Sequence, residues 1–139
     1  MSNKLINLRK LMKINNVELL ALGPGTHMNW LLGFNPYPDE RPCMLLIGKE
    51  KEAFLMPSVN AEDARKRTDI AINSWNDENG PDQALKEALL YIGESSAKHI
   101  AIDEAMRSHF ALILIEALSN PSYEFTTSTI GALRMRKDQ

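Results

Sequence analysis

Short apolar runs alternate along this chain with segments whose apolar residues recur at the three- and four-residue spacing of a helix. This alternation limits the folds that the chain can adopt. The apolar runs are bounded by Gly, Pro or polar turns, which is typical of buried strands. They occupy residues 17–22, 43–47, 53–56, 70–75, 99–102 and 123–125. Helices are predicted over 3–15, 26–32, 60–68, 84–92, 106–118 and from 129 onward. This order predicts an α/β domain, and the two runs around the polar turn 48–51 predict an antiparallel hairpin, so we expect a mixed sheet flanked by helices.

Breaker residues predict where several of these elements end. Gly33 and Gly93 follow helical stripes and are suited to the left-handed conformation that closes a helix. Three prolines between residues 35 and 42 predict an irregular loop. In the stripe over 106–118, Leu112 and Ile115 lie off the main apolar face, so we expect that helix to be covered on more than one side.

Composition excludes several classes of protein. The 139 residues suit one domain, and 44% apolar with 24% charged residues is ordinary for a globular protein. A formal net charge of −2 argues against duplex DNA or an anionic membrane as a partner. The single cysteine, Cys43, excludes an internal disulfide or a zinc cluster, and the charged N-terminus has no signal-peptide pattern. We therefore expect a cytoplasmic protein that binds neither nucleic acid nor membrane.

Side chains capable of catalysis are present but form no recognisable constellation. The three histidines, whose spacing matches no metal-binding motif, are His27, His99 and His109. Adjacent carboxylates such as Asp103 and Glu104 point in different directions along a helix or strand, so we expect them to be solvated. Cys43 opens an apolar run and is expected to be buried rather than reactive. The residues themselves therefore predict no reaction, which is typical of an accessory domain.

Two features are candidates for anion binding. The loop 23–26 (Gly-Pro-Gly-Thr) separates a predicted strand from a predicted helix, so it could cradle an anion at the helix N-terminus. It lacks the third glycine of a dinucleotide-binding fingerprint, and Pro24 has no N–H to donate, so an ordinary turn is the alternative. Arg41 ends the proline-rich loop, where it could bind a carboxylate through two hydrogen bonds or remain solvated.

The order of the segments resembles the N-terminal domain of the creatinase/prolidase/Xaa-Pro aminopeptidase family. Residues 30–34 (Trp-Leu-Leu-Gly-Phe) resemble the Tyr-Leu-Thr-Gly-Phe motif of the family. Arg41, followed by the apolar run 44–47, is similar to the arginine that precedes the hairpin of the family. Residues 100–103 (Ile-Ala-Ile-Asp) and 133–138 (Leu-Arg-Met-Arg-Lys-Asp) resemble a strand that ends in an acid and the linker into the catalytic domain.

The chain departs from the family pattern at three positions near the first motif. His27 stands where the family often has Asn, Trp30 replaces Tyr, and Leu32 replaces Thr. These changes leave the fold unaffected, but they leave open which substrate subgroup is meant.

The resemblance implies a ribonuclease-H-like fold for residues 1–127, with residues 128–139 beginning a linker helix to an absent pita-bread catalytic domain. That absent domain would hold two divalent metal ions, such as manganese or cobalt, and would cleave the bond before proline. This chain would then contain no catalytic residue and no metal ligand. It would serve dimerisation and restrict access to the active site, with Arg41, Trp30 and His27 facing the substrate of their own subunit or, in trans, that of the partner subunit.

Two other functions stay open at this stage. The chain could be a free-standing α/β module that binds a nucleotide or another anion through the loop 23–26. It could also be a family member without a catalytic half that acts as an interaction protein.

Overall fold

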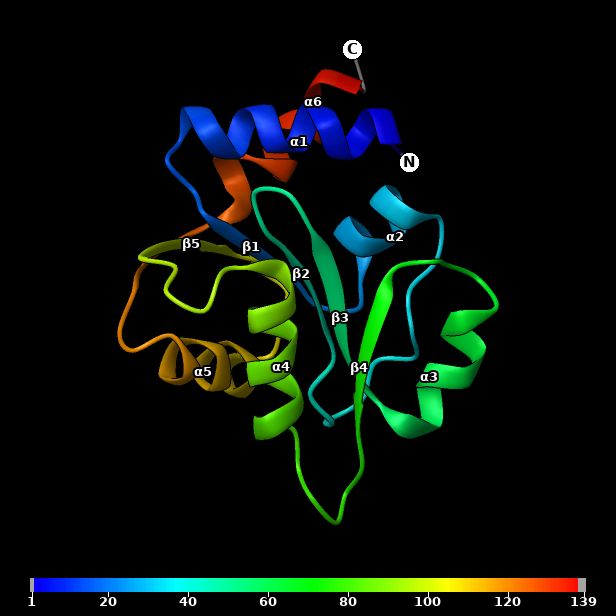
Figure 1. The fold of residues 1–139 in the computed structure, drawn as a ribbon. Coiled ribbons are helices and arrows are strands. Elements are labelled where there is room, and N and C mark those ends of the chain that lie inside the picture. The colour runs from blue at the N-terminus through cyan, green and yellow to red at the C-terminus, as the bar shows by residue number, and fades with distance from the viewer. Residues whose placement is uncertain (1, 138–139) are drawn as a thin grey trace.

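The computed structural model describes residues 2–137, which form six strands and six α-helices with one short 3-10 turn. In chain order the helices are α1 (Ser2–Ile14), α2 (Thr26–Leu32), α3 (Ser58–Arg65), α4 (Asp82–Ile92), α5 (Ser108–Ala117) and α6 (Ile130–Lys137). The strands are β1 (Leu19–Leu22), β2 (Met44–Ile47), β3 (Glu52–Pro57), β4 (Ala71–Trp75), β5 (His99–Ile102) and β6 (Ser122–Phe125). The 3-10 turn η1 (Thr126–Ser128) joins β6 to α6 (Figure 1). The predicted order of strands and helices is therefore confirmed.

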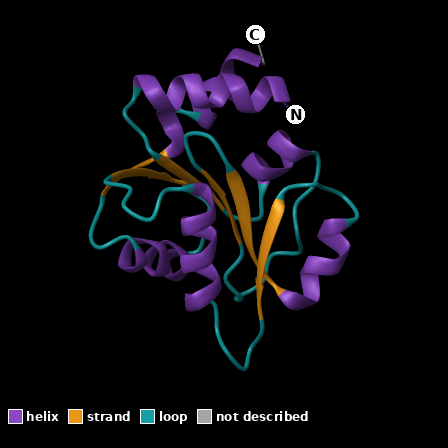
Figure 2. Cartoon of the chain, in the orientation of Figure 1, coloured by secondary structure: helices purple, strands orange, loops and turns teal. Residues whose placement is uncertain are grey.

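All six strands form one mixed sheet in the order β4-β3-β2-β1-β5-β6 (Figure 2). Strand β2 is antiparallel to both of its neighbours, β1 and β3. The remaining pairs, β3 with β4, β1 with β5 and β5 with β6, are parallel. Five strands therefore run in one direction, and the hairpin β2–β3 makes the sheet mixed, as the sequence predicts.

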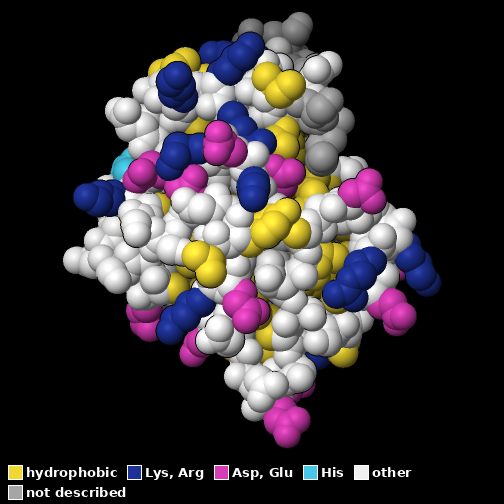
Figure 3. Space-filling model, viewed as in Figure 1, with side chains coloured by type: hydrophobic (Ala, Val, Ile, Leu, Met, Phe, Trp, Pro, Cys, Tyr) yellow, Lys and Arg dark blue, Asp and Glu magenta, His cyan; other side chains and the backbone are white. Residues whose placement is uncertain are grey.

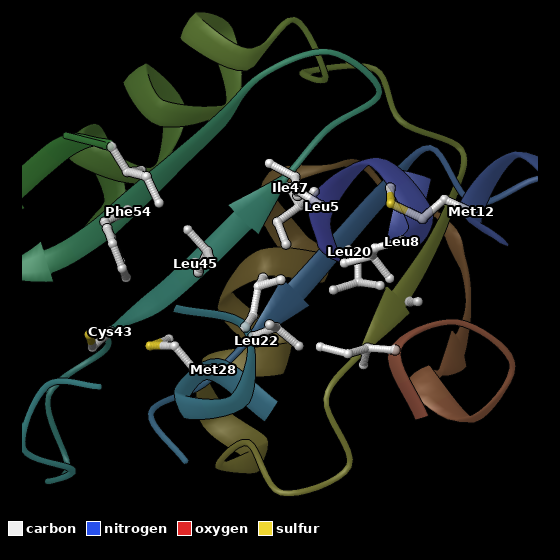
Figure 4. Close-up of a cluster of buried hydrophobic side chains, with 14 of the residues drawn as sticks. Leu5, Leu8, Met12, Leu20, Leu22, Met28, Cys43, Leu45, Ile47 and Phe54 are labelled. Carbon is white, nitrogen blue, oxygen red and sulfur yellow. The ribbon is translucent and has the colours of Figure 1, made fainter. Parts of the chain in front are cut away.

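Residues of β1, β2, β3 and β5 alternate between two apolar cores, one on each face of the sheet. On the first face α1, α2, α3 and α6 cover Leu20, Leu22, Leu45 and Ile47. Figure 4 shows Leu5, Leu8 and Met12 of α1 lying over this part of the sheet. On the second face α4 and α5 cover the intervening residues, which include Leu19, Ala21, Met44 and Leu46. This alternation explains why β1 and β2 carry no polar residues, because both of their faces are buried.

The predicted helix ends are right at the glycines and less accurate elsewhere. Gly33 and Gly93 adopt φ values of 84° and 77° and close α2 and α4 in the left-handed conformation. Helix α5 begins at Ser108 and not at residue 106, because the preceding residues form a turn around Asp103. The expectation that α5 is covered on more than one side is wrong for Leu112, which is 56% exposed, whereas Ile115 is partly buried against the second core.

Helix α6 belongs to the body of the domain as far as the structure describes it. Ile130 and Leu133 are buried in the same core as α1, and the Asn15 amide donates to the carbonyl of Ser128. The helix predicted from residue 129 is thus confirmed, while residues 138 and 139 of the linker motif lie outside the described residues. Within residues 2–137, each helix is too short or too polar to cross a membrane.

Candidate functional site

The C-terminal ends of the five co-directional strands meet at one edge of the sheet. Leu22 pairs with Leu45, so the segment that precedes β2 lies beyond the end of β1. This edge therefore gathers the start of α2, the loop 35–42 and the segments that follow β4, β5 and β6. Ligands of open α/β sheets bind at such an edge, which makes it the place to examine first.

A buried carboxylate, Asp103, occupies the centre of this edge. Asp103 is 3% exposed, and its side chain accepts hydrogen bonds from the backbone N–H of Gly23 at 3.2 Å and of Ala105 at 3.0 Å. The prediction that Asp103 is solvated is therefore wrong, because the parallel pairing of β1 with β5 brings its carboxylate to the end of β1. The N–H of Gly23 is thus already bonded to a carboxylate within the chain. This disfavours the loop 23–26 as a cradle for an external anion.

His27 lies beside Asp103 in a polar cluster that joins four segments. Its Nδ1 lies 3.0 Å from Nη1 of Arg134 in α6, and its Nε2 lies 3.7 Å from Oε1 of Glu104. The hydroxyl of Thr126, which is fully buried, donates to Glu104. Burial opposes ionisation of Glu104, but the hydrogen bond from Thr126 and one from the backbone outweigh it and hold its pKa below the ordinary value.

The residues of this cluster do not fit a metal site, although their ligand atoms lie close together. The ligand atoms of His27, Asp103 and Glu104 lie within 4.8 Å of one another. A guanidinium only donates, so Nδ1 of His27 must accept from Arg134, which leaves the ring proton of a neutral imidazole on Nε2. The nitrogen that faces Glu104 then has no lone pair for a cation. The cation of Arg134 and the amides bound to Asp103 disfavour a metal further.

Arg41 lies in a second group at the same edge. Its Nε is 3.5 Å from Oδ2 of Asp39, and its Nη1 is 3.9 Å from Oδ2 of Asp77. Its side chain is 33% exposed, so the guanidinium faces solvent in part. The indole N–H of Trp75 donates to the carbonyl of Pro42 at 2.9 Å and fixes the end of the loop against β4. Arg41 is therefore a cation that two carboxylates orient and that solvent can reach.

The third predicted site residue, Trp30, packs toward α1. Lys4 donates from Nζ to the carbonyl of Trp30 at 2.7 Å, and the same Nζ lies 4.6 Å from the ring centroid. The structure thus gives each of Trp30, His27 and Arg41 its own set of partners. All three belong to the connections between β1 and β2.

The remaining side chains of reactive types are Cys43, His99 and His109. Their contacts stabilise the fold. Cys43 is buried as expected, and burial together with the charge of Asp39 raises the pKa of its thiol to about 12. His99 lies 2.7 Å from both Ser122 and Glu124 and links β5 to β6. His109 lies 3.1 Å from the carbonyl of Glu40. None of these contacts arranges a nucleophile beside an anion-stabilising pocket.

The cluster around His27 could not be found from sequence spacing. His27 and Arg134 are 107 residues apart. They come together because α2 and α6 pack on the same face of the sheet. One signal was available for Asp103, since Gly23 and Asp103 each follow directly after a predicted strand. The ends of parallel neighbouring strands meet, and this rule would have placed the two residues side by side.

Comparison with known proteins gives one family. The model of the Creatinase/Prolidase N-terminal domain matches residues 4–136. Among curated proteins, none matches this chain. A dipeptidase from Pyrococcus horikoshii OT3 is similar with 25% identity and a TM-score of 0.82, over 95% of this chain and 36% of the dipeptidase. The chain therefore spans about a third of the length of that relative.

Two streptococcal structures match over their whole length. The creatinase/prolidase N-terminal domain of an X-Pro dipeptidase from Streptococcus pyogenes has 18% identity and a TM-score of 0.83, over 97% of this chain and 99% of that chain. A proline dipeptidase structure from Streptococcus pneumoniae has 19% identity and a TM-score of 0.83, with 98% of each chain covered. Both show the fold. The family match over residues 4–136 establishes that this chain belongs to the creatinase/prolidase N-terminal domain family.

Proposed function

We propose that this chain is the non-catalytic N-terminal domain of a cytoplasmic, metal-dependent Xaa-Pro dipeptidase or aminopeptidase. There it supports dimerisation and restricts which peptides reach the active site. One observation carries the proposal: the chain aligns almost end to end with an isolated X-Pro dipeptidase N-terminal domain, yet with only 36% of the Pyrococcus horikoshii dipeptidase. In this proposal the catalytic groups belong to a further domain, outside the part of the dipeptidase that the chain matches.

The side chains at the sheet edge support a binding role without a reaction. Arg41 presents a partly exposed guanidinium, which suits the terminal carboxylate of a short peptide. Trp30 and His27 would border the approach to that carboxylate from α2, in the active site of the same subunit or of the partner subunit. Asp103 and Glu104 are occupied by hydrogen bonds within the chain, so they do not act as general acid or base in this proposal.

Two divalent metal ions, manganese or cobalt, would belong to the catalytic domain. When bound there, such a pair supplies a nucleophilic hydroxide and polarises the scissile carbonyl. The residues of this chain would orient the peptide and exclude longer substrates, while its own polar cluster does not fit a metal.

A hydrolysis assay tests the proposal. The purified chain, supplied with Mn²⁺ or Co²⁺, is incubated with Xaa-Pro dipeptides, and released proline is measured. We expect no release above the metal-only control. The accessory role would be refuted if proline release rises in proportion to the concentration of the chain and is abolished by a chelator.

A further inference from the structure

The guanidinium of Arg41 is held on one side by Asp39. Oδ1 of Asp39 accepts the backbone N–H of Arg41 at 2.9 Å, and Oδ2 lies 3.5 Å from Nε of the same residue. One carboxylate, 23% exposed, thus contacts both the backbone and the inner nitrogen of Arg41. A contact at Nε leaves the two outer amino groups of the guanidinium available, and those groups bind carboxylates.

A second carboxylate approaches from the other side. Oδ2 of Asp77 lies 3.9 Å from Nη1 of Arg41. Asp77 is 77% exposed and follows β4, in a turn closed by hydrogen bonds from Asn79 and Gly80 to the carbonyl of Asn76. The distance is long and the carboxylate is well hydrated, so this ion pair is weak. A ligand carboxylate can therefore displace Asp77 from the outer amino group, whereas Asp39 is fixed by its backbone contact.

We propose that Asp39 is a positioning residue for Arg41 and that Asp77 is a built-in competitor for the ligand carboxylate. In the free domain Asp77 lies where the terminal carboxylate of a short peptide would bind. The ligand class rests on the proposed function, in which Arg41 faces the peptide. Asp77 then sets how strongly a carboxylate must bind before Arg41 releases its internal partner.

The size of the effect follows from the exposure of the pair. Exposed ion pairs of this kind change binding equilibria by a small factor, and removal of the Asp77 charge should tighten carboxylate binding about two- to five-fold. Loss of Asp39 should act in the opposite sense, because Arg41 then loses its fixed orientation and the ligand must order it.

The test is an NMR titration of the full chain with N-acetylproline, which carries a carboxylate beside a proline ring and has no amine. The Nε–Hε signal of Arg41, identified by its loss in Arg41→Lys, reports both orientation and binding. We expect Asp77→Asn to lower the dissociation constant two- to five-fold. Glu78→Gln, a charge-neutralising change at the next residue, should have a smaller effect. Asp39→Asn should broaden the Nε–Hε signal before any ligand is added.

The outcomes separate the role of Asp77 as a competitor from the role of Asp39 as a positioning residue. Equal dissociation constants for Asp77→Asn and the unchanged chain would overturn the competitor role while leaving Arg41 as the carboxylate site. An unchanged Nε–Hε signal in Asp39→Asn would overturn the positioning role. If N-acetylproline shifts the Arg41 signal in no variant, both this inference and the proposed role of Arg41 fail. Amide spectra of each variant establish that the domain remains folded.

Discussion

At the scale of single residues, the polar groups at the sheet edge are matched to one another. Thr126 is fully buried, and its hydroxyl donates to Glu104 across 22 residues of sequence. Asp103 is matched to two backbone amides in the same region. Buried polar groups are stabilising only when paired, so replacement of either partner has a predictable sign.

The first prediction concerns Thr126→Val, which keeps the shape of the side chain and removes the hydroxyl. We expect a loss of about 1–2 kcal/mol in the free energy of unfolding at neutral pH. The folded-state pKa of Glu104 lies below 4.5, so its ionised form stabilises the fold above that pH, and this contribution is lost as the pH falls through the folded value. Urea unfolding should therefore show a smaller difference between the two proteins at pH 3.5 than at pH 7. A constant difference would contradict the pairing.

The second prediction concerns Gly48, where a side chain has no room. A Cβ at this position would lie 2.8 Å from Cγ of Glu94 and 3.3 Å from the carbonyl of Ile92. Gly48→Ala should lower the free energy of unfolding by about 1–3 kcal/mol. Gly25→Ala is the matched control, since the nearest atom to its Cβ would be 4.0 Å away. Equal stability of the two variants in urea unfolding would show that Glu94 moves aside without cost.

At the scale of elements, ion pairs connect three turns that are distant from one another in sequence. Lys49, in the turn between β2 and β3, lies 2.8 Å from Glu94 after α4 and 3.6 Å from Glu18 before β1. Arg9 of α1 adds a contact of 2.8 Å with Glu52. Figure 3 shows basic and acidic side chains interleaved on this face of the molecule. The hairpin turn is therefore fixed to both layers of helices.

Most elements could be predicted because local patterns determine them. Helix α4 carries a clear apolar face and ends at Gly93, and the hairpin is marked by two apolar runs around a polar turn. The first turn of α3 was missed, since Ser58 follows β3 without a break and its hydroxyl bonds to the carbonyl of Trp75. The start of α5 was missed for a related reason, because Asp103 forms a turn that local propensity does not reveal.

The third prediction tests how α1 is attached to the sheet. Leu8 is fully buried in the first core, whereas Ile6 on the same helix is 54% exposed. Leu8→Ala should cost about 2–5 kcal/mol of unfolding free energy through lost burial and a residual cavity. Ile6→Ala should change it by less than about 0.5 kcal/mol. Urea unfolding of the pair measures the difference, and similar losses would contradict the placement of α1.

At the scale of the whole molecule, the network around Lys49 makes stability depend on pH at both ends of the range. The N–H of Lys98 and the charge of Lys49 outweigh burial and lower the pKa of Glu18 below 4.5. A hydrogen bond with Glu94 and the charge of Glu18 raise the pKa of Lys49 above 10.5. Glu18 therefore contributes stability that is lost as the pH falls below 4.5, and Lys49 contributes stability that is lost as the pH rises beyond 10.5.

The fourth prediction follows from the sign of these shifts. Lys49→Gln should be less stable than the unchanged chain near neutral pH, and the difference should shrink as the pH rises above 10.5. Lys10→Gln, a change at an exposed lysine of α1, is the control and should show little pH-dependent difference. Chemical unfolding between pH 7 and pH 11.5 measures both. A difference for Lys49→Gln that stays constant over this range would contradict the role of the ion pair.

Sequence patterns could not predict which residues meet at the candidate site, because the residues that meet there are distant in sequence. Arg41, Trp30 and His27 are predicted from the family motif. Their partners come from segments distant in sequence: Asp77 after β4 for Arg41, Arg134 of α6 for His27 and Lys4 of α1 for Trp30. A cluster of His27, Asp103 and Glu104 gives the outline of a metal site, while Arg134 removes the lone pair that a metal would need. Within residues 2–137, this cluster therefore lacks the donor set that a metal ion would need.

The central claim is that His27, Asp103 and Glu104, whose ligand atoms lie close together among residues 2–137, form no metal site. Isothermal titration of the purified chain with Mn²⁺ at pH 7.5 tests it most directly, with Asp103→Asn as the companion variant. The account predicts no saturable binding in the micromolar range for either protein. One equivalent of Mn²⁺ bound at micromolar concentration by the unchanged chain, and lost in Asp103→Asn, would contradict it.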